Sequence, residues 1–180
     1  PALSDAATAG AGVGKAVAGG RAWSAALDSV LLPGAAAIAV APSHPDTVYA
    51  GAGVGITAGL YRSNDAGAHW DLVALKDHGV SHIVIDPRNP DRIYWMSSVF
   101  RLSEDGGKTY RRGALGVHTD WHGMWIDPGD PDHFILGDDG GIAVTSDRGG
   151  TYDFINTLPI GQFNGVIYRM NDMSGSGLVH

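Results

Sequence analysis

Histidine and aspartate side chains gather in two short stretches of the chain. His118, Asp120 and His122 alternate along the first stretch, and Asp138 and Asp139 are consecutive in the second. If the first stretch is a β-strand, its three side chains point the same way, because side chains alternate between the two faces of a strand. Imidazole and carboxylate groups in this arrangement suit a divalent metal or acid/base chemistry. We therefore take His118, Asp120 and His122 as candidate metal ligands, with a divalent metal as the candidate cofactor.

The carboxylates also suggest a hydrolytic reaction. Hydrolysis of a glycosidic bond needs two carboxyl groups that flank the scissile bond. Asp120, paired with Asp138 or Asp139, is the carboxylate pair that the sequence nominates as catalytic.

Two further interpretations of this region remain open. Trp121 can stack on a sugar ring, and His118 and His122 beside it can bind the same ligand. Trp125 lies nearby, but its place in an apolar run favours the core. In the structural alternative, the histidines and carboxylates bond to neighbouring loops and lock one structural unit to the next.

An eight-residue motif recurs along the chain and shows what kind of scaffold positions these residues. It has a hydroxyl at the first position, Asp at the third, Gly at the fifth and an aromatic ring at the eighth. The three full copies are Ser63, Asp65, Gly67 and Trp70; Ser103, Asp105, Gly107 and Tyr110; and Thr145, Asp147, Gly149 and Tyr152. An eroded copy spans residues 16–23. A period near 40 residues indicates a repeat architecture.

Each motif residue has a structural role that explains its type. The aspartate can accept hydrogen bonds from the backbone amides that follow it, and the glycine supplies the positive φ that closes a tight reversal. The aromatic ring is expected to be buried between layers. We therefore interpret these aspartates as structural and not as catalytic acids.

A second motif travels in register with the first. An apolar run, a Pro-x-x-Pro-Asp turn and a second apolar run occur at residues 38–49, 83–94 and 124–135. This pattern predicts a hairpin, because proline ends a strand and the Asn, Asp and Gly residues suit the reversal. Each period then holds four short strands, at 122–126, 133–137, 142–145 and 151–155 in the clearest unit.

Four strands per period predict an all-β fold, a β-propeller built of four-stranded blades with the motif as a hairpin in each blade. The chain holds about three whole blades, at 36–81, 82–121 and 122–160. Residues 1–35 are expected to be the remnant of a preceding blade, and 161–180 the first strand of a further blade with a frayed tail. Strand alternation places the Pro-Asp turns and the eight-residue motifs on one face, and the candidate site on the opposite face.

The eight-residue motif resembles the Ser-x-Asp-x-Gly-x-Thr-Trp box of Asp-box (BNR) repeat proteins. The stretch from His118 to Pro128, with Leu136–Gly141 and Leu158–Phe163, is most similar to bacterial proteins described as glycosyl hydrolases with BNR repeats, which carry a sortilin-like propeller. This resemblance implies a secreted or periplasmic binding or scaffold domain for glycan or peptide ligands. It implies, as the alternative, an extracytoplasmic glycoside hydrolase. A sialidase is disfavoured, because the chain lacks a Phe/Tyr-Arg-Ile-Pro motif.

Composition narrows the partners. A net charge of −7 without a basic stripe argues against nucleic-acid binding. No apolar stretch has the length of a membrane span, and the N-terminal stretch has no signal-peptide layout. The chain has no cysteine, so disulfides and thiolate zinc sites are excluded. Because an open arc of blades exposes sheet edges, we expect the partners to include the remaining blades of a longer propeller, or a second copy by self-association.

Overall fold

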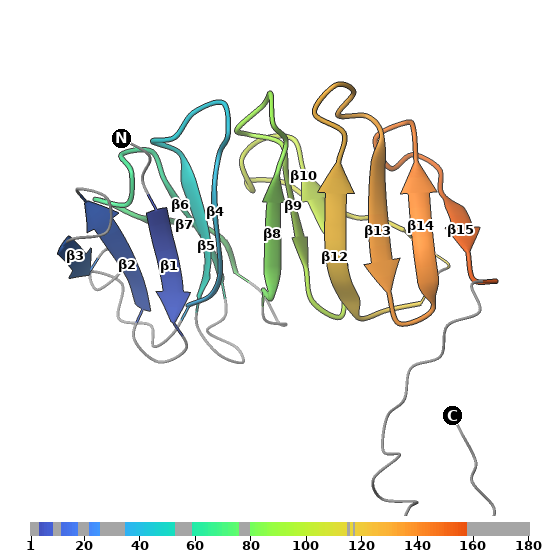
Figure 1. Cartoon of the computed structure of the whole chain (residues 1–180), viewed down its shortest axis with the longest axis horizontal. Coiled ribbons are helices and arrows are strands. Elements are labelled where there is room, and N and C mark those ends of the chain that lie inside the picture. The colour runs from blue at the N-terminus through green and yellow to red at the C-terminus, as the bar shows by residue number, and fades with distance from the viewer. Residues whose placement is uncertain are drawn as a thin grey trace, which may run out of the picture.

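The computed structural model shows an all-β chain (Figure 1). The structure describes residues 4–8, 12–17, 22–25, 35–52, 59–75, 80–114, 116 and 118–157. Within these ranges the chain forms no helix, and hence none that is long and apolar enough to cross a membrane. The predicted strand at the C-terminal end, within 161–180, lies outside the described residues.

In the part of the chain that the structure describes, fifteen strands form four antiparallel sheets, and each sheet joins strands in chain order. The N-terminal sheet contains β1 (Ser4–Thr8), β2 (Gly12–Val17) and β3 (Ala22–Ala25). Blade 1 contains β4 (Ala35–Val40), β5 (Val48–Ala52), β6 (Gly59–Ser63) and β7 (Asp71–Leu75). Blade 2 contains β8 (His82–Ile85), β9 (Ile93–Met96), β10 (Arg101–Ser103) and β11 (Arg111–Arg112). Blade 3 contains β12 (Trp121–Ile126), β13 (Phe134–Asp138), β14 (Gly141–Thr145) and β15 (Asp153–Ile155).

The sheets follow one another side by side in chain order, as Figure 1 shows from blue to orange. The first strands of the three blades contact one another, β4 with β8 and β8 with β12, and β1 contacts β4. The blades therefore converge on their first strands, as the blades of a propeller do. Of the eroded motif copy at 16–23, the first two residues lie in β2 and the last two in β3, and residues 18–21 lie outside the described residues.

Within each blade, the Pro-Asp turn and the eight-residue motif lie at the same end. The amide of the fourth motif residue donates a hydrogen bond to the carbonyl of the turn aspartate in all three blades. These bonds join Ala66 to Asp46 at 2.8 Å, Gly106 to Asp91 at 2.8 Å, and Arg148 to Asp132 at 2.9 Å. The predicted sharing of one face by turns and motifs is confirmed.

The hydroxyl and the carboxylate of each motif form one hydrogen-bonded unit. In blade 2, Ser103 Oγ donates to Asp105 Oδ1 at 2.8 Å and accepts from the amide of Gly107 at 2.9 Å. Asp105 Oδ1 and Oδ2 then accept from the amide and hydroxyl of Thr109, at 2.8 and 2.6 Å. Blade 3 repeats these contacts with Thr145, Asp147, Gly149 and Thr151. In blade 1 the Nδ1 atom of His69 replaces the threonine hydroxyl, 2.6 Å from Asp65 Oδ2.

The reversal needs two consecutive residues with positive φ, whereas the sequence predicted one. The fifth-position glycines have φ values of 85°, 93° and 78° at Gly67, Gly107 and Gly149. The fourth position also has positive φ, and it is occupied by Ala66 and Arg148 in two of the copies. The need for positive φ at the fourth position could not be predicted from the sequence, because two of the three copies have a residue other than glycine there.

The prediction that every motif aromatic is buried is wrong for one copy. Trp70 and Tyr152 are half-buried, but Tyr110 is 45% exposed and meets Trp95 edge to face. Tyr152 instead packs against the core that blades 2 and 3 share. Burial therefore depends on what each ring meets in the neighbouring blade, which the motif does not encode.

Two hydrophobic clusters of the described residues each join neighbouring blades. Strand β9 shows this alternation: Tyr94 and Met96 face the cluster shared with blade 3, and Ile93 and Trp95 face the cluster shared with blade 1. All four side chains are buried. A sheet covered on both faces needs continuous apolar strands, which explains the unbroken apolar runs in the sequence.

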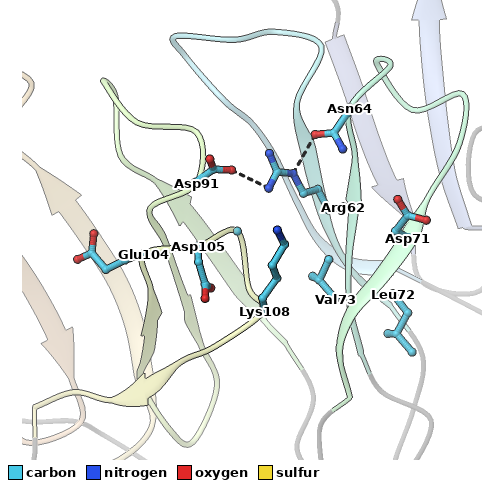
Figure 2. Close-up of a pocket in the computed structure, with 10 residues that line it drawn as sticks. Arg62, Asn64, Asp71, Leu72, Val73, Asp91, Glu104, Asp105 and Lys108 are labelled. Carbon is cyan, nitrogen blue, oxygen red and sulfur yellow. Dashed lines mark hydrogen bonds and ion pairs between the residues drawn. The ribbon is translucent and has the colours of Figure 1, made fainter.

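Polar contacts also join neighbouring blades on the motif face. Tyr49 of β5 donates its hydroxyl to the carbonyl of Pro90 in blade 2 at 3.0 Å, and burial raises its pKa to about 12. Arg62 of β6 pairs with Asp91 of blade 2 at 2.6 Å, as Figure 2 shows. Arg88 repeats the pattern one blade on, because its guanidinium donates to the carbonyl of Pro128 at 2.9 and 3.1 Å.

Gly107→Ala is expected to lower the free energy of unfolding by about 2–4 kcal/mol, because two costs add. The residue has a φ of 93°, and an added Cβ would lie 2.9 Å from Val73 Cγ2 of blade 1. Gly116→Ala is the matched control, because Gly116 has a φ of 88° and no atom within 4 Å of its added Cβ. Urea unfolding should show a loss of only about 1 kcal/mol for the control. Equal losses in the two variants would contradict the packing role.

Candidate functional site

The candidate site lies at the end of blade 3 opposite its motif. The link that precedes β12 carries His118 and Asp120, and the turn after β13 carries Asp139. Two backbone hydrogen bonds hold the link to the β9–β10 turn of blade 2: Asp120 N to Ser98 O at 3.4 Å, and Trp121 N to Ser97 O at 3.0 Å. The site is therefore built where blades 2 and 3 meet.

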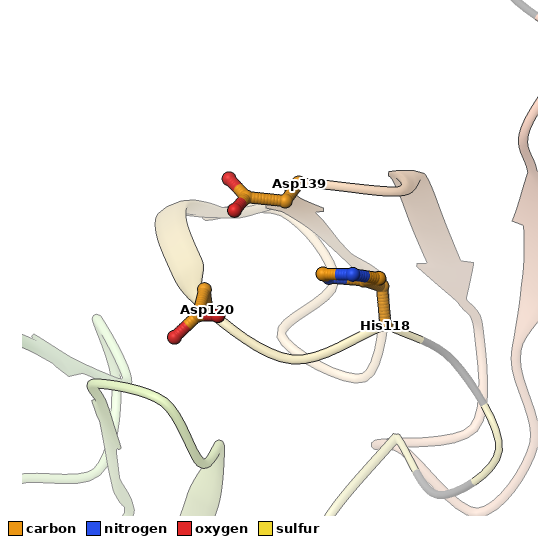
Figure 3. A group of neighbouring side chains, drawn as sticks. All are labelled: His118, Asp120 and Asp139. Atoms are coloured by element: carbon orange, nitrogen blue, oxygen red, sulfur yellow. The ribbon is translucent and has the colours of Figure 1, made fainter. Parts of the chain in front are cut away.

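Three side chains converge there. His118, Asp120 and Asp139 each offer one nitrogen or oxygen atom, and these atoms all lie within 4.8 Å of one another. Figure 3 shows the two link residues beside the turn that carries Asp139. All three residues are exposed. Such a group can bind a polar ligand or a cation.

Two hydrogen bonds orient the members of this group. Nδ1 of His118 lies 2.7 Å from the carbonyl oxygen of Thr119. A carbonyl only accepts, so Nδ1 carries the proton and Nε2 keeps its lone pair. His122 Nε2 lies 2.5 Å from Asp139 Oδ1. His122 is therefore beside the group and bonded to one of its carboxylates.

The sequence predicted a different geometry for His118, Asp120 and His122. It placed them on one strand with their side chains pointing the same way. That expectation is wrong, because β12 begins only at Trp121 and its register shifts between Trp121 and Gly123. Asp120 also has a positive φ of 67°, which turns the chain before the strand begins. In the structure, Asp139 therefore lies with His118 and Asp120. His122 lies outside this group and contacts it only through Asp139.

Asp138 is already engaged by its own turn. Its Oδ1 atom accepts hydrogen bonds from the amides of Gly140 at 2.8 Å and Gly141 at 2.7 Å. This is an Asx-type contact that closes the β13–β14 reversal. Of the nominated carboxylates, Asp120 and Asp139 are the two exposed residues.

The two tryptophans exchange their expected places. Trp121, a candidate for stacking on a sugar, is only 4% exposed and packs near Phe100 at 5.7 Å between ring centroids. Trp125, which the sequence favoured as core, is 51% exposed. Met124 packs against the core of blades 2 and 3, so strand alternation turns Trp125 to the opposite face of blade 3.

A cleft of about 920 Å³ opens on the motif face between blades 1 and 2 (Figure 2). Its lining includes Arg62, Asp91, Asp105 and Lys108. Arg62 and Asp91 pair with each other, and Asp105 belongs to the motif of blade 2. The sequence did not predict this cleft, because it arises from the spacing of two blades.

The motif aspartates lack the properties of catalytic acids. Hydrogen bonds from the Thr109 hydroxyl and amide lower the pKa of Asp105 to about 2, and the Thr151 amide is the main cause of a pKa of about 2 at Asp147. The amide and ring of His69 hold the pKa of Asp65 well below its usual range. A general acid needs a pKa near the working pH, so the structural interpretation of these aspartates holds.

These depressed pKa values predict acid sensitivity. A carboxylate with a lower pKa in the folded state stabilises the fold above its unfolded pKa near 4, and that contribution is lost as pH falls through about 2. We expect the urea midpoint to fall steeply between about pH 4 and pH 2. Asp105→Asn should make the fall shallower, and an identical slope for this variant would contradict the assignment.

The fold defines the class of protein: the described chain is part of a β-propeller, with three four-stranded blades and an adjoining three-stranded sheet. No protein-family model matches the chain, and no curated protein matches its sequence. A GH74 enzyme from Niastella koreensis superposes with a TM-score of 0.75 and 19% identity, over 87% of this chain and 28% of that protein. An ancestral GH74 enzyme gives a TM-score of 0.70 and 16% identity, over 85% of this chain and 22% of that protein.

A second group of similar structures consists of YCF48 proteins. YCF48 from Cyanidioschyzon merolae gives a TM-score of 0.54 and 15% identity, over 77% of this chain and 40% of that protein. A YCF48 structure bound to D1 peptide gives a TM-score of 0.52 and 11% identity, over 86% of this chain and 44% of that protein. At these identities the likeness shows the fold alone. The chain spans about a quarter of the length of the GH74 structures.

Proposed function

We propose that this part of a propeller acts as an extracytoplasmic binding or scaffold domain. Its loop face, which is the face opposite the eight-residue motifs, binds a glycan or peptide ligand. The observation that supports it is the convergence of His118, Asp120 and Asp139 on an exposed surface where two blades meet. Functional groups on loops held by a rigid scaffold are typical of binding sites. The YCF48 structure bound to a peptide gives a precedent for peptide binding on this fold.

Binding of an immobilised chain to a glycan array and a peptide library tests this proposal. We expect the double variant Asp120→Asn/Asp139→Asn to lose at least tenfold in affinity for any ligand found. Asp127→Asn is the matched control, because Asp127 is a half-buried aspartate in a Pro-Asp turn at the opposite end of blade 3. Binding that is unchanged in the double variant would contradict the proposed site.

Glycoside hydrolysis is the second candidate function. It is favoured by one observation: Asp120 and Asp139 present oxygens within 4.8 Å of each other, and both residues are exposed. Oxygens less than 4.8 Å apart are too close for the roughly 6.5–9.5 Å spacing of inverting enzymes, so a retaining reaction is the class that this pair fits better. A reducing-sugar assay on a panel of polysaccharides should show release that Asp120→Asn and Asp139→Asn each abolish. Release that survives both substitutions would exclude this pair.

We propose that the face of blade 3 that points away from blade 2 is covered by a further blade, from a longer chain or from a second copy. Strand pairing places Trp125, Ile135 and Val144 in one row of this face, beside a pair formed by Ile142 and Ile155. Trp125 and Ile155 are 51% and 41% exposed. The residue that matches Ile135 in each preceding blade, Tyr49 or Tyr94, is buried against the next blade.

Light scattering after size-exclusion chromatography tests self-association through this face. We expect the chain to run as a dimer or larger species, and Trp125→Ser to shift it toward the monomer. Leu72→Ser is a suitable control, since Leu72 is 46% exposed on blade 1. A well-folded monomer whose urea midpoint is unaffected by Trp125→Ser would contradict cover by a second copy.

A further inference from the structure

We propose that His118, Asp120 and Asp139 bind a divalent transition metal ion of the zinc class, with His122 as the residue that orients Asp139. This inference goes beyond ligand binding by the loop face, and it stands whether that ligand is a glycan, a peptide or neither. It also differs from the metal-ligand set that the sequence nominated, because Asp139 takes the place of His122.

The donor set points to the class of metal. One imidazole nitrogen and two carboxylate oxygens lie within 4.8 Å of one another. Bonds of about 2.0–2.2 Å to one ion bring donors to at most about 4.4 Å apart, so small side-chain rotations close this group on an ion. Calcium and magnesium prefer all-oxygen ligand sets, whereas an imidazole nitrogen suits zinc and its first-row neighbours. Three protein ligands also leave a coordination position open to solvent, since all three residues are exposed.

The contacts around His118 favour coordination through Nε2. A metal-binding histidine commonly donates its other ring proton to a carbonyl or carboxylate, which fixes the tautomer and the ring orientation. His118 makes this contact, with Nδ1 2.7 Å from the carbonyl oxygen of Thr119. The turn after β13 passes close to this residue, because an added Cβ at Gly140 would lie 2.6 Å from His118 Cβ. The hydrogen bond to Thr119 therefore orients the imidazole beside the turn that carries Asp139.

Asp139 is held in a comparable way. His122 Nε2 lies 2.5 Å from Asp139 Oδ1, and their side chains are 64% and 29% exposed. A hydrogen bond to one oxygen leaves the other free for a metal and fixes the direction of the carboxylate. Asp120 completes the set from the link, which two backbone hydrogen bonds anchor to Ser97 and Ser98 of blade 2. The three donors thus come from two segments, the link before β12 and the β13–β14 turn, which the contact between His122 and Asp139 joins.

Titration of the full chain with zinc chloride in a calorimeter tests the site, and cobalt chloride provides a spectroscopic readout of coordination. We expect one equivalent of zinc to bind, and cobalt to show visible absorption bands typical of a low coordination number. His118→Ala, Asp120→Asn and Asp139→Asn should each weaken zinc binding by at least 100-fold. His122→Gln should weaken it by about 10–100-fold, as expected for a residue that positions a ligand.

The controls separate this site from unspecific zinc binding and from misfolding. His44→Gln is matched, because His44 is exposed in the Pro-Asp turn of blade 1 and should leave zinc affinity unchanged. The exposed positions of the three ligands mean that circular dichroism and the urea midpoint should match those of the unmodified chain. The proposal is overturned if zinc fails to bind, if Asp139→Asn binds zinc as the unmodified chain does, or if His44→Gln weakens binding as much as His118→Ala.

Discussion

Phe134→Ala is expected to lower the free energy of unfolding by about 3–5 kcal/mol, which is the largest effect we predict from loss of packing. Phe134 has no exposed surface and lies at the centre of the cluster that joins blades 2 and 3. Its ring lies 5.2 Å from the Tyr94 ring and 6.2 Å from the Tyr152 ring, both edge to face. Truncation leaves a cavity between two sheets that cannot close without moving a blade.

The neighbouring residue provides the control for this prediction. Ile135 follows Phe134 on β13, but its side chain turns to the opposite, partly exposed face of blade 3. Ile135→Ala should therefore cost less, about 1–2 kcal/mol, since part of the side chain stays in contact with water and its removal opens no enclosed cavity. Urea unfolding monitored by tryptophan fluorescence measures both values. A similar loss for the two variants would show that the core between blades 2 and 3 does not dominate stability.

Asp86→Ala is expected to cost about 3–5 kcal/mol, because it removes the fully buried partner of the Arg92 guanidinium and leaves two turn amides without their acceptor. The Asp86 side chain has no exposed surface, and its Oδ2 atom lies 2.7 Å from an Arg92 nitrogen. Its Oδ1 atom accepts from the amides of Arg88 at 2.7 Å and Asn89 at 3.0 Å. The Asp86 side chain thus closes the Pro-Asp turn of blade 2 and also pairs with the positive charge of Arg92.

The repeat supplies the matched control for this substitution. Asp127 occupies the same position in blade 3, but its side chain is 37% exposed, and its contacts are the Gly129 amide at 2.7 Å and His133 at 3.9 Å. Asp127→Ala should cost about 1 kcal/mol or less. Arg92 keeps Glu104 Oε2 at 2.7 Å from its Nε atom, so the double variant Asp86→Ala/Arg92→Leu should recover only a small part of the loss. A loss for Asp86→Ala no larger than that for Asp127→Ala would contradict a stabilising role for the buried pair.

Much of the fold follows from local chemistry that the sequence displays. In blade 3 the predicted strand at 122–126 corresponds to β12, and that at 142–145 to β14, within one residue at either end. These strands could be predicted because proline, glycine and aspartate mark their turns through backbone geometry alone. The hydroxyl–aspartate–glycine motif was also legible, because its hydrogen bonds join residues only two to four positions apart.

The grouping of the candidate residues was predicted only in part. His118, Asp120 and Asp139 were all nominated from the sequence, but the predicted metal-ligand set contained His122 where the structure brings Asp139 to the other two. The error came from treating residues 118–122 as a regular strand, whereas positive φ at Asp120 and a register shift after Trp121 redirect the side chains. A bulge depends on pairing with β13, and no pattern within the link itself reveals it.

Sequence periodicity by itself determined that this chain is an all-β array of four-stranded blades, and which residues close its hairpins. It could do so because the period of the turns and the alternation of strands are properties of the backbone and of near neighbours. Tertiary structure alone decided that Trp121 is buried and Trp125 is exposed. It also decided that Gly107 packs closely against Val73 of the preceding blade, and that Asp139 lies beside His118. Each of these features depends on how two segments far apart in the chain pack together, and local sequence patterns do not specify which distant segments come into contact.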